Sequence, residues 1–168
     1  MDVASLLVEL YGRIPPLAHE AIAGLSRDEL VAQPAPGANS IAWLVWHTTR
    51  VQDHHVAEIL EAHQVWVEGT WAERFGLDPD PSNTGYGHAP ADVRSVAPVQ
   101  PSDLEQYLGA VQERTTTWLR ALTAADLERV VDRRWDPPVT MGVRLVSVAD
   151  DALQHLGQAA YVRGLLGH

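Results

Sequence analysis

The 168-residue chain contains no cysteine and no lysine. Without cysteine the protein has no disulfide bond, no thiolate metal ligand and no cysteine nucleophile. All twelve basic residues are arginine, and the formal net charge is −10 with histidine neutral. An acidic chain without clustered cations argues against nucleic acid as a partner.

Long apolar runs are also missing. No basic N-terminus leads into one, and no stretch approaches the length of a membrane span. We therefore expect a cytoplasmic protein without a membrane partner. A chain of this length is most simply one domain, residues 1–168, and it is long enough to bury a core without covalent cross-links.

Helical periodicity dominates the first half of the sequence. Apolar residues recur at helical spacing over 2–24, where Pro15-Pro16 predicts a kink or a division into two pieces. Residues 26–29 form a capping-box pattern that predicts a short helical turn. A second long helix is expected over about 40–63, after an Asn-Ser pair suited to capping.

The second half predicts two more long helices. A short helix is expected at 70–75, followed by a Pro-, Gly- and Ser-rich crossover at 76–101. A capping-box pattern at 102–105 opens the third long helix, and a short helix at 123–131 precedes a last helix that begins after Thr140. No strand-length alternating run competes with these helices. The pattern predicts an all-α four-helix bundle with a long crossover between helices two and three.

The second long helix begins with Ile41 to His47, which are apolar on nearly every side. Such a helix is buried on more than one face, inside the bundle or against another subunit, and we therefore expect a homodimer. Its later turns are amphipathic, with Arg50, Asp53, Glu58 and Glu61 among the polar positions.

A metal site is indicated by Asp151 and His155, which lie four residues apart in the last helix and leave its same face. His47, in the most apolar part of the second helix, is the best partner for this pair. Two imidazoles and one carboxylate leave an open position on a divalent metal, as in catalytic zinc sites. The alternative is that His47 is a core histidine with a backbone partner and that Asp151 pairs with an arginine.

Two stretches carry a family resemblance. The run Asn39–His47 (NSIAWLVWH), followed by Asp53, and the run Gln154–Gln158 (QHLGQ) resemble the DinB/YfiT-like superfamily. That superfamily includes mycothiol-dependent maleylpyruvate isomerases and the bacillithiol and mycothiol S-transferases. The resemblance covers nearly the whole chain and implies a metal-binding four-helix bundle, often dimeric, with a crossover between helices two and three.

The resemblance also implies the ligand set. Family members use one histidine on the second helix and two residues four apart on the fourth, which are His47, Asp151 and His155 here. Asp151 departs from the commonest pattern, in which histidine is frequent and glutamate occurs; its short side chain bears on metal affinity and identity. Zinc or nickel is the expected ion, and Gln158, one turn beyond His155, is expected to orient a ligand or face the substrate.

Other residues are weaker candidates for the site. His54 and His55 are expected either to line the pocket or to be ordinary histidines, and His54 is too far along the helix to share one metal with His47. Together with Asp53, His55 could line the mouth of the site. The segment 84–88 is interpreted as an ordered turn, with a cover over the pocket as the alternative.

Three arginines, Arg133, Arg134 and Arg144, flank the start of the last helix and could hold a substrate carboxylate. Pairing with Asp132, Asp136 or Asp150 is the alternative reading.

Two classes of function follow from this. The first is an enzyme whose divalent metal binds a low-molecular-weight thiol such as mycothiol and lowers its pKa, for transfer to a small-molecule electrophile or for isomerisation; a metal-dependent hydrolase is its variant. The second is a non-catalytic, stress-related metal-binding or dimerisation bundle. It predicts a fourth protein ligand and no pocket beside the metal.

Overall fold

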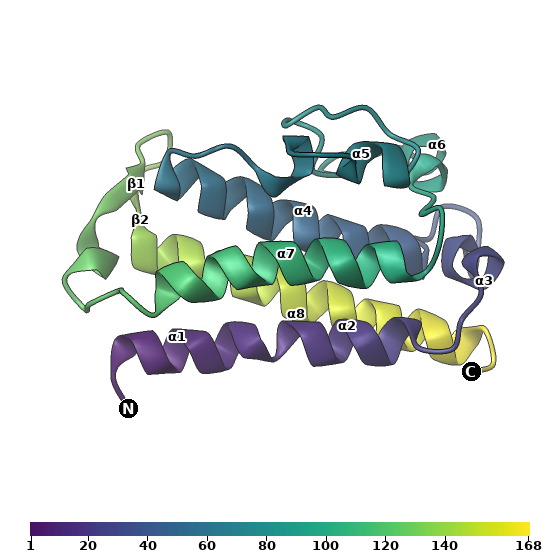
Figure 1. Ribbon diagram of the computed structural model, residues 1–168, viewed down its shortest axis with the longest axis horizontal. Helices are drawn as coiled ribbons and strands as arrows, with labels where there is room; N and C mark the ends of the chain where they lie inside the picture. Colours follow the sequence, from purple (N-terminus) through teal and green to yellow (C-terminus); the bar gives the residue numbers. More distant parts are fainter.

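Two long helices, α4 (Ile41–Leu60) and α8 (Met141–Leu165), pack side by side and in opposite directions. In the computed structural model, which describes residues 1–168, α7 (Ser102–Leu119) and the rod formed by α1 (Val3–Gly12) and α2 (Ile14–Ile22) cover them (Figure 1). The predicted all-α four-helix bundle is confirmed. None of its helices is both long and apolar enough to cross a membrane.

Short elements connect the long helices. They are α3 (Arg27–Val31), the 3₁₀ turns η1 (Val65–Val67) and η2 (Asp126–Glu128), α5 (Trp71–Arg74), α6 (Pro90–Ser95), and the paired strands β1 (Val130–Asp132) and β2 (Val139–Thr140). The helix α6 lies in a stretch predicted to be loop. The crossover that contains it returns the chain to the end of the bundle where α4 began, so α7 runs in the same direction as α4 (Figure 1).

The first rod is divided into two pieces, as Pro15-Pro16 predicted. α1 ends at Gly12, and the two prolines fall in the first turn of α2. Proline has no amide hydrogen. In the first turn of a helix no hydrogen bond is lost, but inside an uninterrupted helix one backbone hydrogen bond would be missing. Tyr11 is fully buried next to this break, and its hydroxyl donates a hydrogen bond to the Leu145 carbonyl of α8 (2.8 Å). This bond fixes the α1–α2 rod to the helix that carries Asp151 and His155.

Three helix starts follow from local sequence chemistry. Ser26 and Glu29 form the predicted capping box, and the Ser40 hydroxyl accepts from the Trp43 amide at the start of α4. Thr140 caps α8 in the same way. Each such cap typically contributes about 1 kcal/mol, because it satisfies an amide that the helix leaves unpaired.

Several predicted boundaries were wrong. α4 ends at Leu60 rather than near His63, because Glu61 takes a left-handed conformation (φ 53°). Ser102 does not cap α7: it is the first helical residue after Pro101, and the buried Asp103 carboxylate accepts from the Gln100 amide instead.

The predicted helix at 123–131 was also wrong. Only Asp126–Glu128 forms a helical turn there, and the residues that follow form the strand β1, which pairs antiparallel with β2. The hairpin matters for the site because its tip, residues 133–138, extends beside the end of α4 (Figure 1).

The apolar start of α4 is buried within a single chain. All ten residues from Ile41 to Arg50 are buried, against α8, α7 and the crossover. The sequence feature that suggested a second subunit is thus satisfied inside the bundle, and the homodimer stays a prediction. Light scattering of the purified protein would test it.

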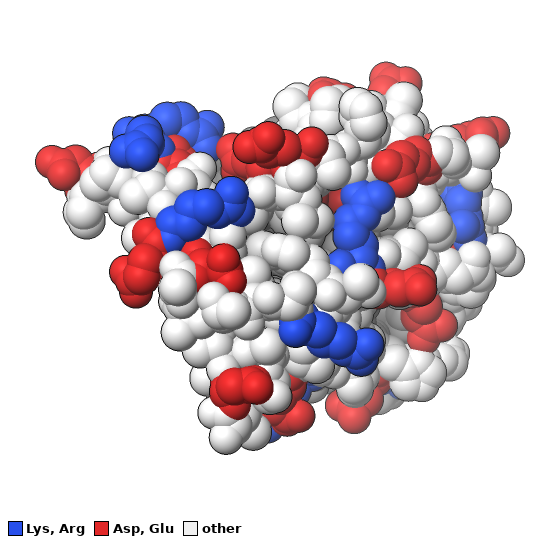
Figure 2. Space-filling model, turned by 60° about the vertical axis from the view of Figure 1, so that its left-hand side comes forward, with Lys and Arg blue, Asp and Glu red and all other residues white.

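Acidic and basic side chains are interspersed over the face shown in Figure 2, and no extended basic field is visible there. The expectation that nucleic acid is not a partner stays a prediction.

Candidate metal centre

Three potential ligands converge between α4 and α8. His47 comes from α4, Asp151 and His155 come from α8, and one ligand atom of each lies within 4.8 Å of the others. Asp151 and His155 share a face because they are one helical turn apart. The His47 and His155 rings meet edge to face, with centroids 4.8 Å apart. The structure therefore brings together all three residues that the sequence placed at one site.

His47 is held in one orientation by the crossover. Its Nδ1–H donates to the Thr84 carbonyl (2.5 Å), and its ring stacks on Trp43 with centroids 4.6 Å apart. Burial lowers the pKa of His47, which favours the neutral ring. With the proton on Nδ1, the lone pair of Nε2 is free for a ligand, and a backbone carbonyl on the other nitrogen is the usual support of a metal-binding histidine.

His155 is oriented by its own helix. Its Nδ1 lies 3.1 Å from the Gln158 amide oxygen, and its Nε2 lies 3.5 Å from Asp151 Oδ1. Hydrogen bonding to Asp151 raises the pKa of His155. A neutral ring that donates from Nδ1 to Gln158 turns the lone pair of Nε2 toward a carboxylate oxygen. That arrangement is stable only with a proton or a cation between the two atoms.

The Asp151 carboxylate provides a test of whether these residues suit a metal. Its Oδ2 atom is buried without any hydrogen-bond partner, and no arginine pairs with it. An unpaired buried oxygen costs roughly 1–3 kcal/mol, more when it is charged. A cation held by His47 Nε2, His155 Nε2 and this carboxylate would remove that cost. The donor set of two imidazoles and one carboxylate also suits a borderline divalent ion such as zinc.

A pocket of about 330 Å³ opens beside His47 and Asp151. Its walls come from α4, α8, the crossover and the hairpin tip, and its lining residues are His47, Val51, His54, His55, Thr84, Tyr86, Arg134 and Asp151. His54 and His55 therefore line the site pocket, as one of the two sequence interpretations had it. His54 Nδ1 accepts from the Gln64 amide (3.1 Å), which leaves Nε2–H as its donor.

His54, His55 and Glu58 form a second group whose ligand atoms lie close together. This group already has cations beside it. Arg144 Nη1 lies 3.5 Å from His55 Nε2, and Arg134 Nη2 lies 3.6 Å from Glu58 Oε1. A metal ion there would face two guanidinium groups, so the arrangement favours a hydrogen-bonded network over a second metal site.

Arg144 and Arg134 share one carboxylate. Asp132 Oδ2 accepts from Arg144 (2.7 Å) and from Arg134 (2.8 Å), so pairing with an acidic residue, the alternative expected from sequence, is what the structure shows. Arg144 is mostly buried and lines an adjoining cavity with Asp132, Arg134 and Trp135, outside the pocket at His47. Arg134 lines both spaces and is largely exposed.

Asp53 does not line the mouth of the pocket, the position considered for it from sequence. It is fully buried. Its two oxygens accept from the amides of Val65 (2.9 Å) and Trp66 (2.8 Å), and the Tyr107 hydroxyl also donates to it. Asp53 therefore holds the chain segment that follows α4.

The segment 84–88 lies against His47 and forms part of the pocket wall. It is an ordered turn, as expected, and it also supplies the Thr84 carbonyl to His47 and the Gly85 backbone against the rings of α4. His88, at its end, accepts from Trp43 Nε1 (3.1 Å) and faces Asn83 Oδ1 (2.9 Å). From sequence, Trp43 and Thr84 were named only within the runs 39–47 and 84–88, and neither was given a role of its own at the site. Trp43 lies one turn before His47, and this spacing was the available signal.

His55 supplies a pH prediction. Burial, reinforced by Arg144 and His54, lowers the pKa of His55 to about 4. An unfolded histidine titrates near 6.5, so between about pH 6.5 and pH 4 the unfolded chain binds a proton that the folded chain does not. This group therefore costs stability as pH falls, roughly 1–3 kcal/mol once pH 4 is reached. His55→Gln should remove that part of the acid loss.

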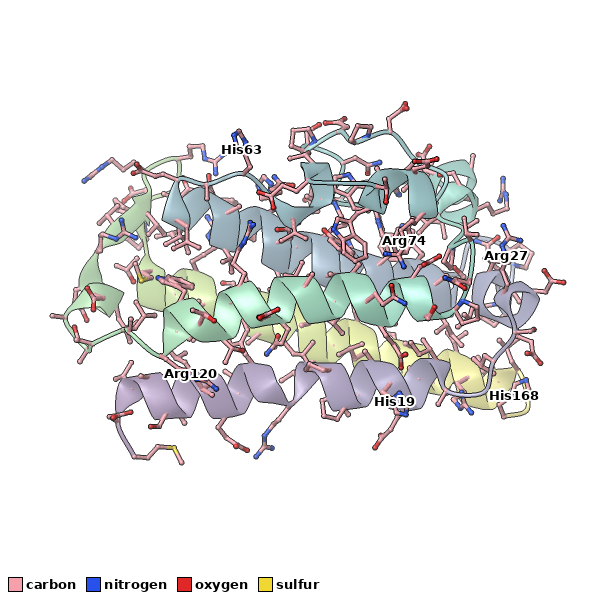
Figure 3. All side chains as sticks on the ribbon, in the orientation of Figure 1. His19, Arg27, His63, Arg74, Arg120 and His168 are labelled. Carbon is pink, nitrogen blue, oxygen red and sulfur yellow. The ribbon has the colours of Figure 1, made fainter.

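The measurement is urea unfolding of both proteins at intervals from pH 4 to pH 7.5. His63→Gln, at the exposed histidine labelled in Figure 3, corrects for the general effect of the substitution. A stability difference between wild type and His55→Gln that does not change with pH would contradict the prediction.

Comparison with known proteins agrees with this fold. Residues 13–159 match the family model of the DinB superfamily. The crystal structure of a conserved protein from Enterococcus faecalis is 34% identical to the chain, with a TM-score of 0.90 over 99% of this chain and 98% of that one. None of the curated proteins searched is a significant match. The chain belongs to the DinB superfamily.

Proposed function

We propose that the protein is a divalent-metal-dependent enzyme that activates a low-molecular-weight thiol, of the mycothiol type, for transfer to a small electrophile or for isomerisation. The observation that carries the proposal is the convergence of His47, Asp151 and His155 beside an open pocket. In this superfamily those positions hold the metal, and zinc or nickel suits the donor set.

The three residues offer two neutral rings and one negative charge to the ion. Thr84 fixes the proton of His47 on Nδ1, and Gln158 does the same for His155, so both Nε2 atoms are available. An ion held there would supply a Lewis acid that lowers the pKa of a thiol in the pocket. The chain has no thiol of its own, so the sulfur nucleophile comes from a cofactor.

The pocket favours this function over a purely structural metal. A structural site is closed by a fourth protein ligand. The additional histidine His54 lines the pocket, and its Nδ1 accepts a hydrogen bond from the Gln64 amide. Tyr86 and Trp135, on the crossover and the hairpin tip, are highly exposed at the two adjoining spaces and offer aromatic surface to a bound molecule.

The experiment begins with elemental analysis of protein purified without an affinity tag. One equivalent of zinc or nickel is expected, and removing it with a chelator should abolish thiol consumption in an assay with mycothiol and a chromogenic aryl halide. Zinc should restore the activity to wild type but not to a His47→Ala, His155→Ala double variant. An open catalytic ion contributes less to folding than a structural one does. Removing the metal should therefore abolish activity but lower the melting temperature only modestly.

Two results would overturn the proposal. One is a wild-type protein that binds no divalent ion. The other is a metal-loaded protein that melts far above its metal-free form yet neither consumes thiol nor isomerises a conjugated acid in the presence of thiol, which is the behaviour of a structural metal. Hydrolysis of activated esters without thiol consumption would instead assign the metal to a hydrolase.

A further inference from the structure

Residues 81–85 form a strap that lies along α4 without regular secondary structure. Backbone carbonyls of an irregular segment need partners when they are buried. Here the partners are side chains of α4 and of the residue that precedes η1. The Thr84 carbonyl accepts from His47, the Asn83 and Pro81 carbonyls accept from Arg50, and Pro81 accepts also from Gln64.

Arg50 makes more of these contacts than any other residue. Its Nε donates to the Asn83 carbonyl (2.9 Å) and its Nη2 to the Pro81 carbonyl (3.2 Å). The side chain is completely buried, although it carries a charge. A buried guanidinium is tolerated only when charge and donors are both satisfied.

The remaining side of the guanidinium is satisfied by the bundle. Nη1 donates to the Tyr107 hydroxyl (3.2 Å) and faces Asp53 Oδ2 (3.5 Å), and the group lies over the Trp66 ring at 4.8 Å. The planar guanidinium of Arg50 thus donates to two strap carbonyls on one side and contacts the Asp53 carboxylate and the Tyr107 hydroxyl on the other. A lysine ammonium has the charge but not this geometry.

The strap in turn determines the state of His47. The carbonyl held by Arg50 belongs to Asn83, and the next carbonyl along the chain is the Thr84 acceptor of His47 Nδ1. Arg50 lies one turn beyond His47 on the same face of α4. Any shift of the strap away from Arg50 therefore moves the acceptor that keeps the His47 proton on Nδ1 and Nε2 unprotonated.

We propose that Arg50 is a positioning residue of the metal centre, which acts through the strap to hold His47 as the Nδ1–H tautomer with Nε2 ready to bind the ion. This inference rests on the proposed metal binding, and its first readout does not require the metal. Arg50 touches none of the three ligands directly, and this positioning role is additional to its contribution to stability.

The first test uses nuclear magnetic resonance on the metal-free full chain. Wild type should show His47 as the Nδ1–H tautomer with a slowly exchanging ring proton. Arg50→Lys keeps the charge beside Asp53 but loses the fork, and it should give a mixture of tautomers and at least tenfold faster exchange. A folded Arg50→Lys protein with wild-type tautomer and exchange overturns the inference.

The matched control is Arg74→Lys. Arg74, labelled in Figure 3, reaches from α5 to the buried Asp103 of α7 and does not contact the strap. The Arg74→Lys substitution should lower the melting temperature and leave the His47 resonance unchanged. If Arg50→Lys fails to fold, Gln64→Met takes its place, because it removes a second donor to Pro81 and should accelerate exchange in the same direction; no acceleration overturns the inference.

The second test is zinc affinity, measured by competition with a chromophoric chelator. Arg50→Lys should bind zinc about 10–100-fold more weakly, the usual effect of losing a residue that supports a ligand, and Arg74→Lys within about twofold of wild type. Equal affinity in wild type and Arg50→Lys overturns the inference alone. A wild type that binds no zinc but shows the expected tautomer result overturns the proposed function alone.

Discussion

Gly85→Ala is expected to weaken zinc binding by more than about 100-fold and to destabilise the fold by roughly 2–5 kcal/mol. Gly85 has a φ of +92°, a conformation that side-chain-bearing residues rarely adopt. A Cβ atom there would lie 2.7 Å from His47 Nδ1, 3.0 Å from Trp46 Cζ3 and 3.1 Å from Trp43 Cζ2. These rings are buried and cannot move aside, so the strap must move away from α4. The Thr84 carbonyl, which accepts from His47, then moves with it.

Gly87→Ala separates the two parts of this effect. Gly87 lies in the same turn and also has a positive φ (+75°), but a Cβ there would meet no atom within 4 Å. It should cost about 1 kcal/mol of backbone strain and leave zinc affinity unchanged. Chemical unfolding and chelator competition on both variants give the comparison. Equal zinc affinity in the Gly85 and Gly87 variants would contradict a strap that seats His47.

The pairing of Asp151 with His155 followed from helical periodicity, whereas the addition of His47 also needed the family resemblance, because periodicity left a core histidine as an equal alternative. Asp151 and His155 share a face at any helical spacing of four, and His47 lies in the most apolar part of the helix most deeply buried in the bundle. Caps such as Ser40 and Thr140 were equally local, since each satisfies an amide three residues away.

The pairing of buried polar residues could not be predicted from the sequence. Arg50 and Asp53 were expected among the polar positions of an amphipathic stretch, yet both are buried, because each satisfies the other and the chain segments around it. Their charges cancel only once the strap and η1 are folded against α4. The hairpin was missed for a related reason: strands of three and two residues are too short to show alternation, and their register is irregular.

Asp53→Ala is expected to cost about 3–5 kcal/mol, a large part of the total stability of a domain of this size. The substitution leaves the Arg50 guanidinium buried without its carboxylate, and the amides of Val65 and Trp66 lose their acceptors. Asp103→Ala is the matched control, because Asp103 is as deeply buried but its partner, Arg74, is one-quarter exposed and can turn to water. Asp103→Ala should therefore lower the free energy of unfolding clearly less than Asp53→Ala does.

A second variant distinguishes the charge from the hydrogen bonds. Replacing a buried ion pair by apolar side chains is often neutral, because it removes the desolvation cost of both charges. Arg50→Met with Asp53→Leu should nevertheless stay destabilised, since the amides at 65 and 66 and the carbonyls at 81 and 83 lose their partners. Urea unfolding of the four proteins measures these differences. Recovery of wild-type stability in the double variant would mean that the pair holds no backbone in place, and the strap would then need another support.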